Sequence, residues 1–161
     1  MGRARRTVLA WGVLWLALVV ALQDPAPLPV ATEAERRAVL LRSLVTQGDA
    51  AAVAYTLREL ERGLPPQVLA TFLDTAREHP RPVFAAAIER LCQYRSVGIR
   101  VRALLALAAI DGWGARAAWL AMDDAEPRVR RLGLLLAERH TDPALEEAAL
   151  RLREREPSLT P

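Results

Sequence analysis

The chain has 161 residues, of which 52% are apolar, so it is long enough to bury one core and too short for several domains. Its formal net charge is +3, but Arg3, Arg5 and Arg6 precede an apolar run, and the other 19 basic residues (22 − 3) face 19 acidic ones. Because nucleic-acid binding relies on a basic surface that neutralises phosphates, this balance argues against a nucleic-acid partner.

Residues 1–23 have the pattern of a segment that directs export. After the basic start, the run from Thr7 to Leu22 carries no charge. As a helix it would span roughly 24 Å, short of the ~30 Å hydrocarbon core, which favours a cleaved signal peptide. The missing Ala-x-Ala site favours a retained signal anchor instead. We expect a membrane-anchored protein with its helical domain in the periplasm or outside, and keep a soluble periplasmic or secreted protein as the alternative.

Three further segments follow in the chain. Alternating prolines in residues 24–31 predict an extended, semi-rigid spacer. Residues 32–157 carry helical apolar spacing throughout, and residues 158–161 are expected to form a disordered tail. All 22 basic residues are Arg, which indicates a GC-rich gene and favours a bacterial source.

Helix starts and stops are marked by capping residues, Pro and Gly, beginning with the capping box Thr32-Glu33-Ala34-Glu35. No stretch alternates at period two with β-branched enrichment, so no strand is predicted. The predicted helices are 33–47, 49–62, 65–78, 82–94, 97–110, 114–122, 126–139 and 142–155. We pair 49–62 with 65–78, 82–94 with 97–110, and 114–122 with 126–139, and expect the first and last helices to act as caps.

The sequence repeats within this helical part. Arg100-Val101-Arg102 and Arg128-Val129-Arg130, 28 residues apart (100 to 128), each precede an apolar helix. Such a short helix cannot bury its apolar stripe alone, so recurrence at this period predicts stacked helical repeats.

The second copy carries the more specific motif, Asp123-Asp124-Ala125-Glu126-Pro127-Arg128-Val129-Arg130. It resembles the bacterial form of the HEAT repeat, whose second helix begins Asp-x-x-Pro-x-Val-Arg. Asp124, Pro127, Val129 and Arg130 match that motif, and in the first copy Val101 and Arg102 match it. The resemblance implies an all-α, right-handed α-solenoid of about three helical hairpins with capping helices, used as a binding scaffold without chemistry of its own.

Residues that could carry chemistry are few. His79 and His140 both end second helices, roughly 20 Å apart if the layers are spaced as packed helices are, so they cannot share a metal. There is no Gly-rich phosphate loop and no Gly-x-Ser-x-Gly motif. The single Cys92 falls at helical spacing with apolar residues, which indicates a buried side chain. We predict no catalytic, cofactor-binding or metal site and no small-molecule substrate.

The candidate interaction residues are the four arginines of the repeated motif, Arg100, Arg102, Arg128 and Arg130, together with Asp124. Equivalent positions of stacked repeats line up, so we expect Arg102 and Arg130 to form a ladder beside Asp124, with Arg128 more exposed. Bridging of neighbouring repeats and binding of a ligand are both open to such a ladder.

Two other features have two interpretations each. Trp113, in a turn between glycines, either plugs the end of a hairpin or serves as an exposed interaction anchor. The acidic cluster of Asp123, Asp124 and Glu126 either caps the helix that follows or binds a cation.

From these residues we expect a non-enzymatic scaffold that binds a protein partner on the outer side of a bacterial cytoplasmic membrane. The second helices, 65–78, 97–110 and 126–139, would line its concave side. Two alternatives are a purely structural periplasmic spacer and an accessory subunit resembling the HEAT-like bilin lyases.

Overall fold

The computed structural model of the chain describes residues 31–159. The predicted signal segment 1–23 and nearly all of the spacer 24–31 lie outside the described residues. At the other end, Ser158 and Leu159 belong to a 3₁₀ turn, and Leu159 is buried. The folded part therefore extends two residues beyond the predicted boundary at 157.

The described part is all-helical, as predicted, and contains no strand. Within it, the predicted helix at 82–94 begins as a 3₁₀ turn and ends earlier than expected. The elements are α2 Glu33–Gln47, α3 Ala50–Arg62, α4 Pro66–Glu78, η1 Pro82–Phe84, α5 Ala85–Leu91, α6 Val97–Ala108, α7 Gly114–Met122, α8 Pro127–Ala137, α9 Pro143–Arg155 and η2 Pro157–Leu159.

The helices begin and end where the sequence places caps. The Asp49 carboxylate accepts the Ala52 N–H at 2.8 Å, and Asp142 accepts the Ala144 N–H at 2.9 Å. Each carboxylate satisfies a backbone donor that the first turn leaves free. Gly63 follows α3 with a φ of 85°, a backbone conformation that favours glycine.

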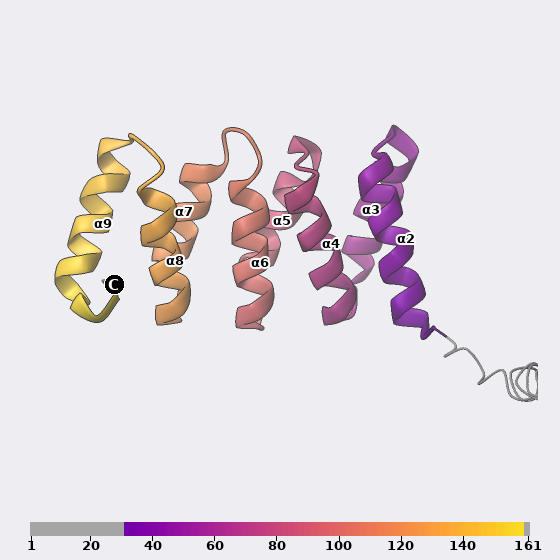
Figure 1. Cartoon of the computed structure of the whole chain (residues 1–161), viewed down its shortest axis with the longest axis horizontal. Coiled ribbons are helices and arrows are strands. Elements are labelled where there is room, and N and C mark those ends of the chain that lie inside the picture. The colour runs from indigo at the N-terminus through magenta and orange to yellow at the C-terminus, as the bar shows by residue number, and fades with distance from the viewer. Residues whose placement is uncertain (1–30, 160–161) are drawn as a thin grey trace, which may run out of the picture. The chain divides into compact units, whose positions relative to one another are not determined.

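The helices of residues 33–159 lie in two layers. Figure 1 shows α2, α4, α6 and α8 side by side in one row, with α3, α5 and α7 behind it, and each helix of the row packs on the next. Helix α9 packs on α7 and α8. The expected pairing of 49–62 with 65–78 is wrong: α3 packs mainly on α2, because only Gly48 and Asp49 separate these two helices.

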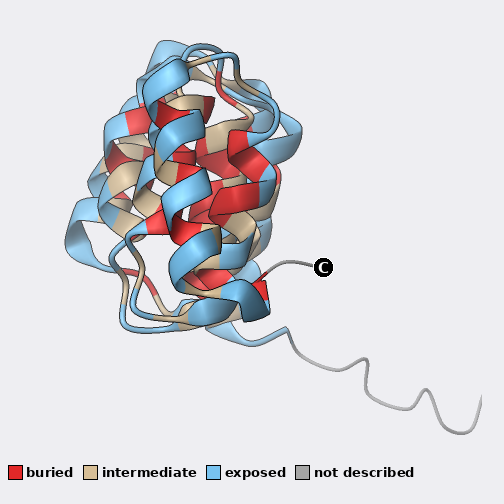
Figure 2. Ribbon diagram, turned by 90° about the vertical axis from the view of Figure 1, so that its left-hand side faces the viewer, coloured by how far each residue is buried: buried red, intermediate tan, exposed pale blue. Residues whose placement is uncertain are grey.

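The core lies between the two layers, where Figure 2 shows the buried residues on the inner sides of the helices. Phe72 of α4 and Phe84 of η1 meet edge to face, with ring centroids 5.6 Å apart. One carboxylate is also buried: Glu59 of α3 contacts Arg37 of α2 at 3.4 Å and Arg62 at 2.8 Å. These two cations neutralise a charge that would be costly to bury alone.

The interior gives the repeat a different register from the one predicted. Helix α6 buries Ile99, Ala103, Leu104, Ala106 and Leu107, and α8 buries Val129, Gly133, Leu134, Leu136 and Ala137. Every residue of the first set is 30 positions before its counterpart (99 to 129), so the matching motif at 28 residues misaligns the two helices by two positions.

Candidate functional site

Arg100 joins two consecutive repeats through one side chain. Its Nε and Nη2 atoms donate to the two carboxylate oxygens of Asp124 at 2.7 and 2.8 Å. Its Nη1 atom donates to the carbonyls of Tyr94 and Arg95, in the turn before its own helix, at 3.1 and 3.5 Å. The planar guanidinium suits this arrangement, because its two edges bind separate groups at once.

Arg130, 30 residues later (100 to 130), makes the same set of contacts. Its Nη1 donates to the carbonyls of Asp124 and Ala125, both at 2.8 Å, and its Nε and Nη2 donate to Glu156 beyond α9. The carbonyls that it binds are also 30 positions after those that Arg100 binds (94 to 124). We call Arg100 with Asp124, and Arg130 with Glu156, the two arginine bridges.

The two bridges correct the predicted ladder. Arg102, not Arg100, was expected beside Asp124, but Arg102 contacts Asp74 of α4 at 3.3 Å and stays 44% exposed. The reason is the register: Arg100, not Arg102, occupies the position of Arg130. Arg130 does lie beside Asp124, as predicted, and Arg128 is exposed, as predicted.

Asp124 is held ionised by its surroundings. Burial opposes its charge, but hydrogen bonds from Arg100 and from the Glu126 N–H, with the charges of Arg100 and Arg130, lower the pKa of its carboxyl below the ordinary value. This contact with the Glu126 N–H also supports the capping interpretation of the acidic cluster.

We expect Asp124 to contribute stability at neutral pH that is lost in acid. Because its pKa is lower in the folded than in the unfolded state, the contribution is present above the unfolded value of about 3.9 and is lost as the pH falls through the folded value. Urea denaturation of the wild type and Asp124→Asn between neutral pH and about pH 3 tests this. The wild type should lose more stability than the variant below about pH 4; parallel curves would contradict the assignment.

The other predicted residues have structural surroundings. Trp113 is half-buried against the core just before α7, which supports the plug interpretation. Cys92 is buried, and burial raises the pKa of its thiol to about 12, with Glu89 adding to the effect, so it is un-ionised at neutral pH. His79 follows α4, and the ring of His140 packs against Gly114. Residues 31–159 contain no group of three or more potential metal-binding side chains.

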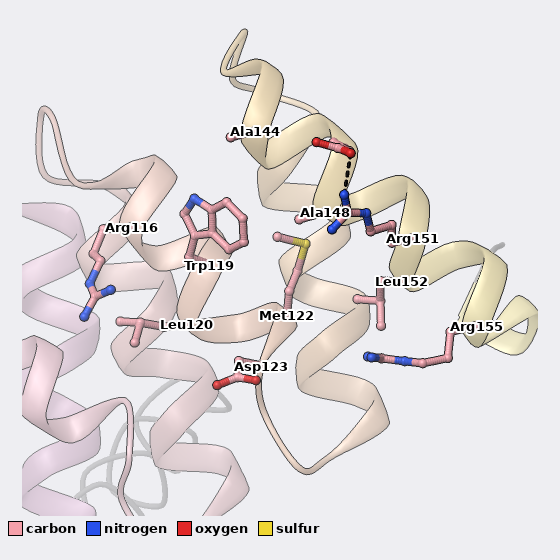
Figure 3. Close-up of a pocket in the computed structure, with 11 residues that line it drawn as sticks. Arg116, Trp119, Leu120, Met122, Asp123, Ala144, Ala148, Arg151, Leu152 and Arg155 are labelled. Atoms are coloured by element: carbon pink, nitrogen blue, oxygen red, sulfur yellow. Dashed lines mark hydrogen bonds and ion pairs between the residues drawn. The ribbon is translucent and has the colours of Figure 1, made fainter.

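The largest hollow on the described surface is a groove of about 630 Å³ between α7 and α9. Figure 3 shows Trp119, Leu120 and Met122 on the α7 side, facing Ala148 and Leu152 of α9. Met122 and Leu152 are buried and form part of the apolar floor, whereas Trp119 is 38% exposed. We call this feature the α7–α9 groove.

Charged side chains surround the apolar floor of the α7–α9 groove. Arg116 and Arg151 are held by carboxylates, Glu89 at 2.7 Å and Glu147 at 2.5 Å. Arg155 and Asp123 complete the rim, and Arg155 is 70% exposed. An apolar floor with an exposed indole and a polar rim is the anatomy of a protein-binding surface.

The sequence analysis did not identify this groove. Trp119 and Met122 are part of the apolar spacing of a short helix, which is equally typical of core residues. The available signal was Trp119 itself, because a large aromatic residue is costly to leave half-exposed in the absence of a role.

Comparison of the chain with protein-family models, with curated proteins and with solved structures finds no match in any of the three. The described helices include none that is both long enough and apolar enough to cross a membrane.

Proposed function

We propose that residues 33–159 form a HEAT-like, right-handed helical stack that acts as a non-enzymatic scaffold for a protein partner. The observation that carries this proposal is the α7–α9 groove, with Trp119 at its edge and an apolar floor below it. The 30-residue repetition of the buried positions and of the arginine bridges supports the stack. The exported, membrane-anchored placement of the scaffold rests on the sequence of residues 1–23 alone.

The chemistry of the groove favours a protein ligand over a small molecule. Its sides are two amphipathic helices, and the groove is open along both. A small ligand is typically enclosed over most of its surface, whereas an open groove of this kind fits a helix or an extended segment that inserts a few apolar side chains. Trp119 would be the anchor, because buried aromatic residues dominate binding energy at interfaces.

Site-specific photocrosslinking in the source cells tests the proposal. A photoreactive phenylalanine analogue replaces Trp119 in one protein and Leu150 in a control; Leu150 is 50% exposed on α9 and does not line the groove. We expect a discrete protein adduct at position 119 that is absent at position 150, and its mass spectrum identifies the partner. If neither position gives an adduct, the groove is not a binding site and the spacer alternative is favoured.

Once that partner is known, Trp119→Ala should weaken its binding about tenfold or more, the loss typical of an aromatic anchor. The variant should lose only about 1 kcal/mol of folding stability, because the indole is already partly in solvent. Titration calorimetry with the identified partner and urea denaturation measure the two quantities. Unchanged affinity at unchanged stability would remove Trp119 from the site.

A further inference from the structure

The outward face of α8 carries a strip of basic and apolar side chains. Arg128, Leu132, Leu135 and Arg139 follow one another at i, i+4, i+7 and i+11, so they share one face of the helix and of the turn after it, and Arg131 flanks them. Leu135 is 51% exposed and Leu132 is partly buried. We call these five residues the α8 strip.

The arginines of the α8 strip are unpaired. Among residues 31–159, Arg128, Arg131 and Arg139 have no ion pair with a carboxylate. The one carboxylate of α8 itself is that of Glu138, at its end, which is held by Arg153 of α9 at 2.5 Å.

The carboxylates at the start of α8 are also engaged elsewhere: Asp124 is bound by Arg100, and Glu126 adds to the field around Arg100. Three exposed cations therefore remain available on one short helix.

The apolar part of the α8 strip continues onto the neighbouring helix. Helix α6 packs beside α8, and 30 residues before Arg131 and Leu135 it carries Val101 and Leu105, both half-buried. The surface thus combines an apolar centre with cations from α8 around it. A ligand that matches it must offer both apolar groups and negative charge.

We infer that the α8 strip binds an acidic amphipathic peptide segment of a partner protein. Its carboxylates would pair with Arg128, Arg131 and Arg139, and its apolar side chains would cover Leu132 and Leu135. Nucleic acid fits less well, because its phosphates would have to lie over the two leucines and make no use of them. The inference does not depend on the α7–α9 groove, which is formed by other helices.

Fluorescence anisotropy with a synthetic probe tests the inference on the full chain. The probe is a fluorescein-labelled peptide of about 14 residues, four helical turns, with Leu at helical spacing on one face and Glu elsewhere. Two matched peptides carry Gln in place of Glu, or Ser in place of Leu. We expect saturable binding of the Glu/Leu peptide, at least tenfold weaker binding of both matched peptides, and weakening of the first by added salt.

Charge reversal locates the binding site. The combined change Arg128→Glu, Arg131→Glu and Arg139→Glu should weaken the Glu/Leu peptide at least tenfold. The control Arg36→Glu, Arg90→Glu and Arg95→Glu alters net charge equally at three exposed arginines, also unpaired within the described residues, and should weaken it less than threefold. Leu135→Ala should weaken it about threefold or more.

Several results would overturn the inference: equal losses in the two charge-reversed variants, equal binding of the matched peptides by the wild type, or tighter binding of a DNA duplex than of the peptide. The matched peptides are measured on the wild-type protein, so that arm stands even if a charge-reversed variant fails to fold. Because Trp119 is unchanged throughout, crosslinking at the groove reports separately on the proposed function.

Discussion

Replacing Arg100 with Ala should lower the free energy of unfolding by roughly 3–4 kcal/mol, the loss typical when one partner of a buried ion pair is removed. The Arg100 side chain is 14% exposed and that of Asp124 is 8% exposed, so the carboxylate would keep its charge in a largely dry site without its cation. The carbonyls of Tyr94 and Arg95 would lose their donor at the same time.

Arg100→Lys is the matched variant for this prediction. An ammonium keeps the charge but cannot bind both oxygens of Asp124 and the carbonyls of the preceding turn together, so we expect Lys to restore less than half of the loss. Urea denaturation followed by circular dichroism gives the three free energies. Full recovery with Lys would mean that charge alone, without the planar geometry, accounts for the bridge.

The second large effect is expected at Gly133, where α7 and α8 approach most closely. A Cβ atom added there would lie 2.6 Å from the Met122 N atom and 2.9 Å from the Ala121 carbonyl carbon, and backbone atoms cannot move aside as a flexible side chain can. Gly133→Ala should therefore cost roughly 1–3 kcal/mol through overpacking, even after the ~1 kcal/mol by which Ala favours a helix.

Gly98→Ala is the control for Gly133→Ala. Gly98 lies in the first turn of α6, and a Cβ there would meet side-chain atoms only, none closer than 3.7 Å. We expect this variant to gain up to about 1 kcal/mol, because only the helix preference acts. Melting temperatures of the two variants should move in opposite directions; a stabilised Gly133→Ala protein would show that α7 and α8 can separate at little cost.

The helix ends could be predicted from sequence because they depend on local chemistry. Asp49, Asp142 and Pro127 act within one turn of their own helices, and each begins its helix as expected. The helix at 82–94 was overestimated, since nothing local to Pro82 indicates that its first turn is 3₁₀.

The register of the repeat could not be read from the matching motif. The two Arg-Val-Arg motifs are similar as text, but Val129 is fully buried whereas Val101 is half-buried, and Ile99 occupies the position of Val129. Helix starts carry the better signal: Val97 and Pro127 begin their helices 30 residues apart (97 to 127), and Pro157 begins η2 at the same interval (127 to 157).

The α7–α9 groove was beyond the sequence for a different reason. Apolar spacing predicts that Trp119, Met122 and Leu152 face other helices, but whether a gap remains depends on how α9 lies against α7. The arginine bridges lie between these cases: the residue types and their role between repeats were predicted, and the partner of each arginine followed only once the register was known.

The 30-residue register is tested most directly by alanine replacement of all four motif arginines, with the free energy of unfolding measured in urea. We expect Arg130→Ala to lose roughly 1–3 kcal/mol and Arg100→Ala somewhat more, because both side chains are largely buried in bridges. Arg102→Ala and Arg128→Ala should each change stability by about 0.5 kcal/mol or less, since both side chains are exposed. If Arg102→Ala proves as costly as Arg130→Ala while Arg100→Ala is tolerated, the 28-residue alignment is correct and the two arginine bridges do not hold the repeats together.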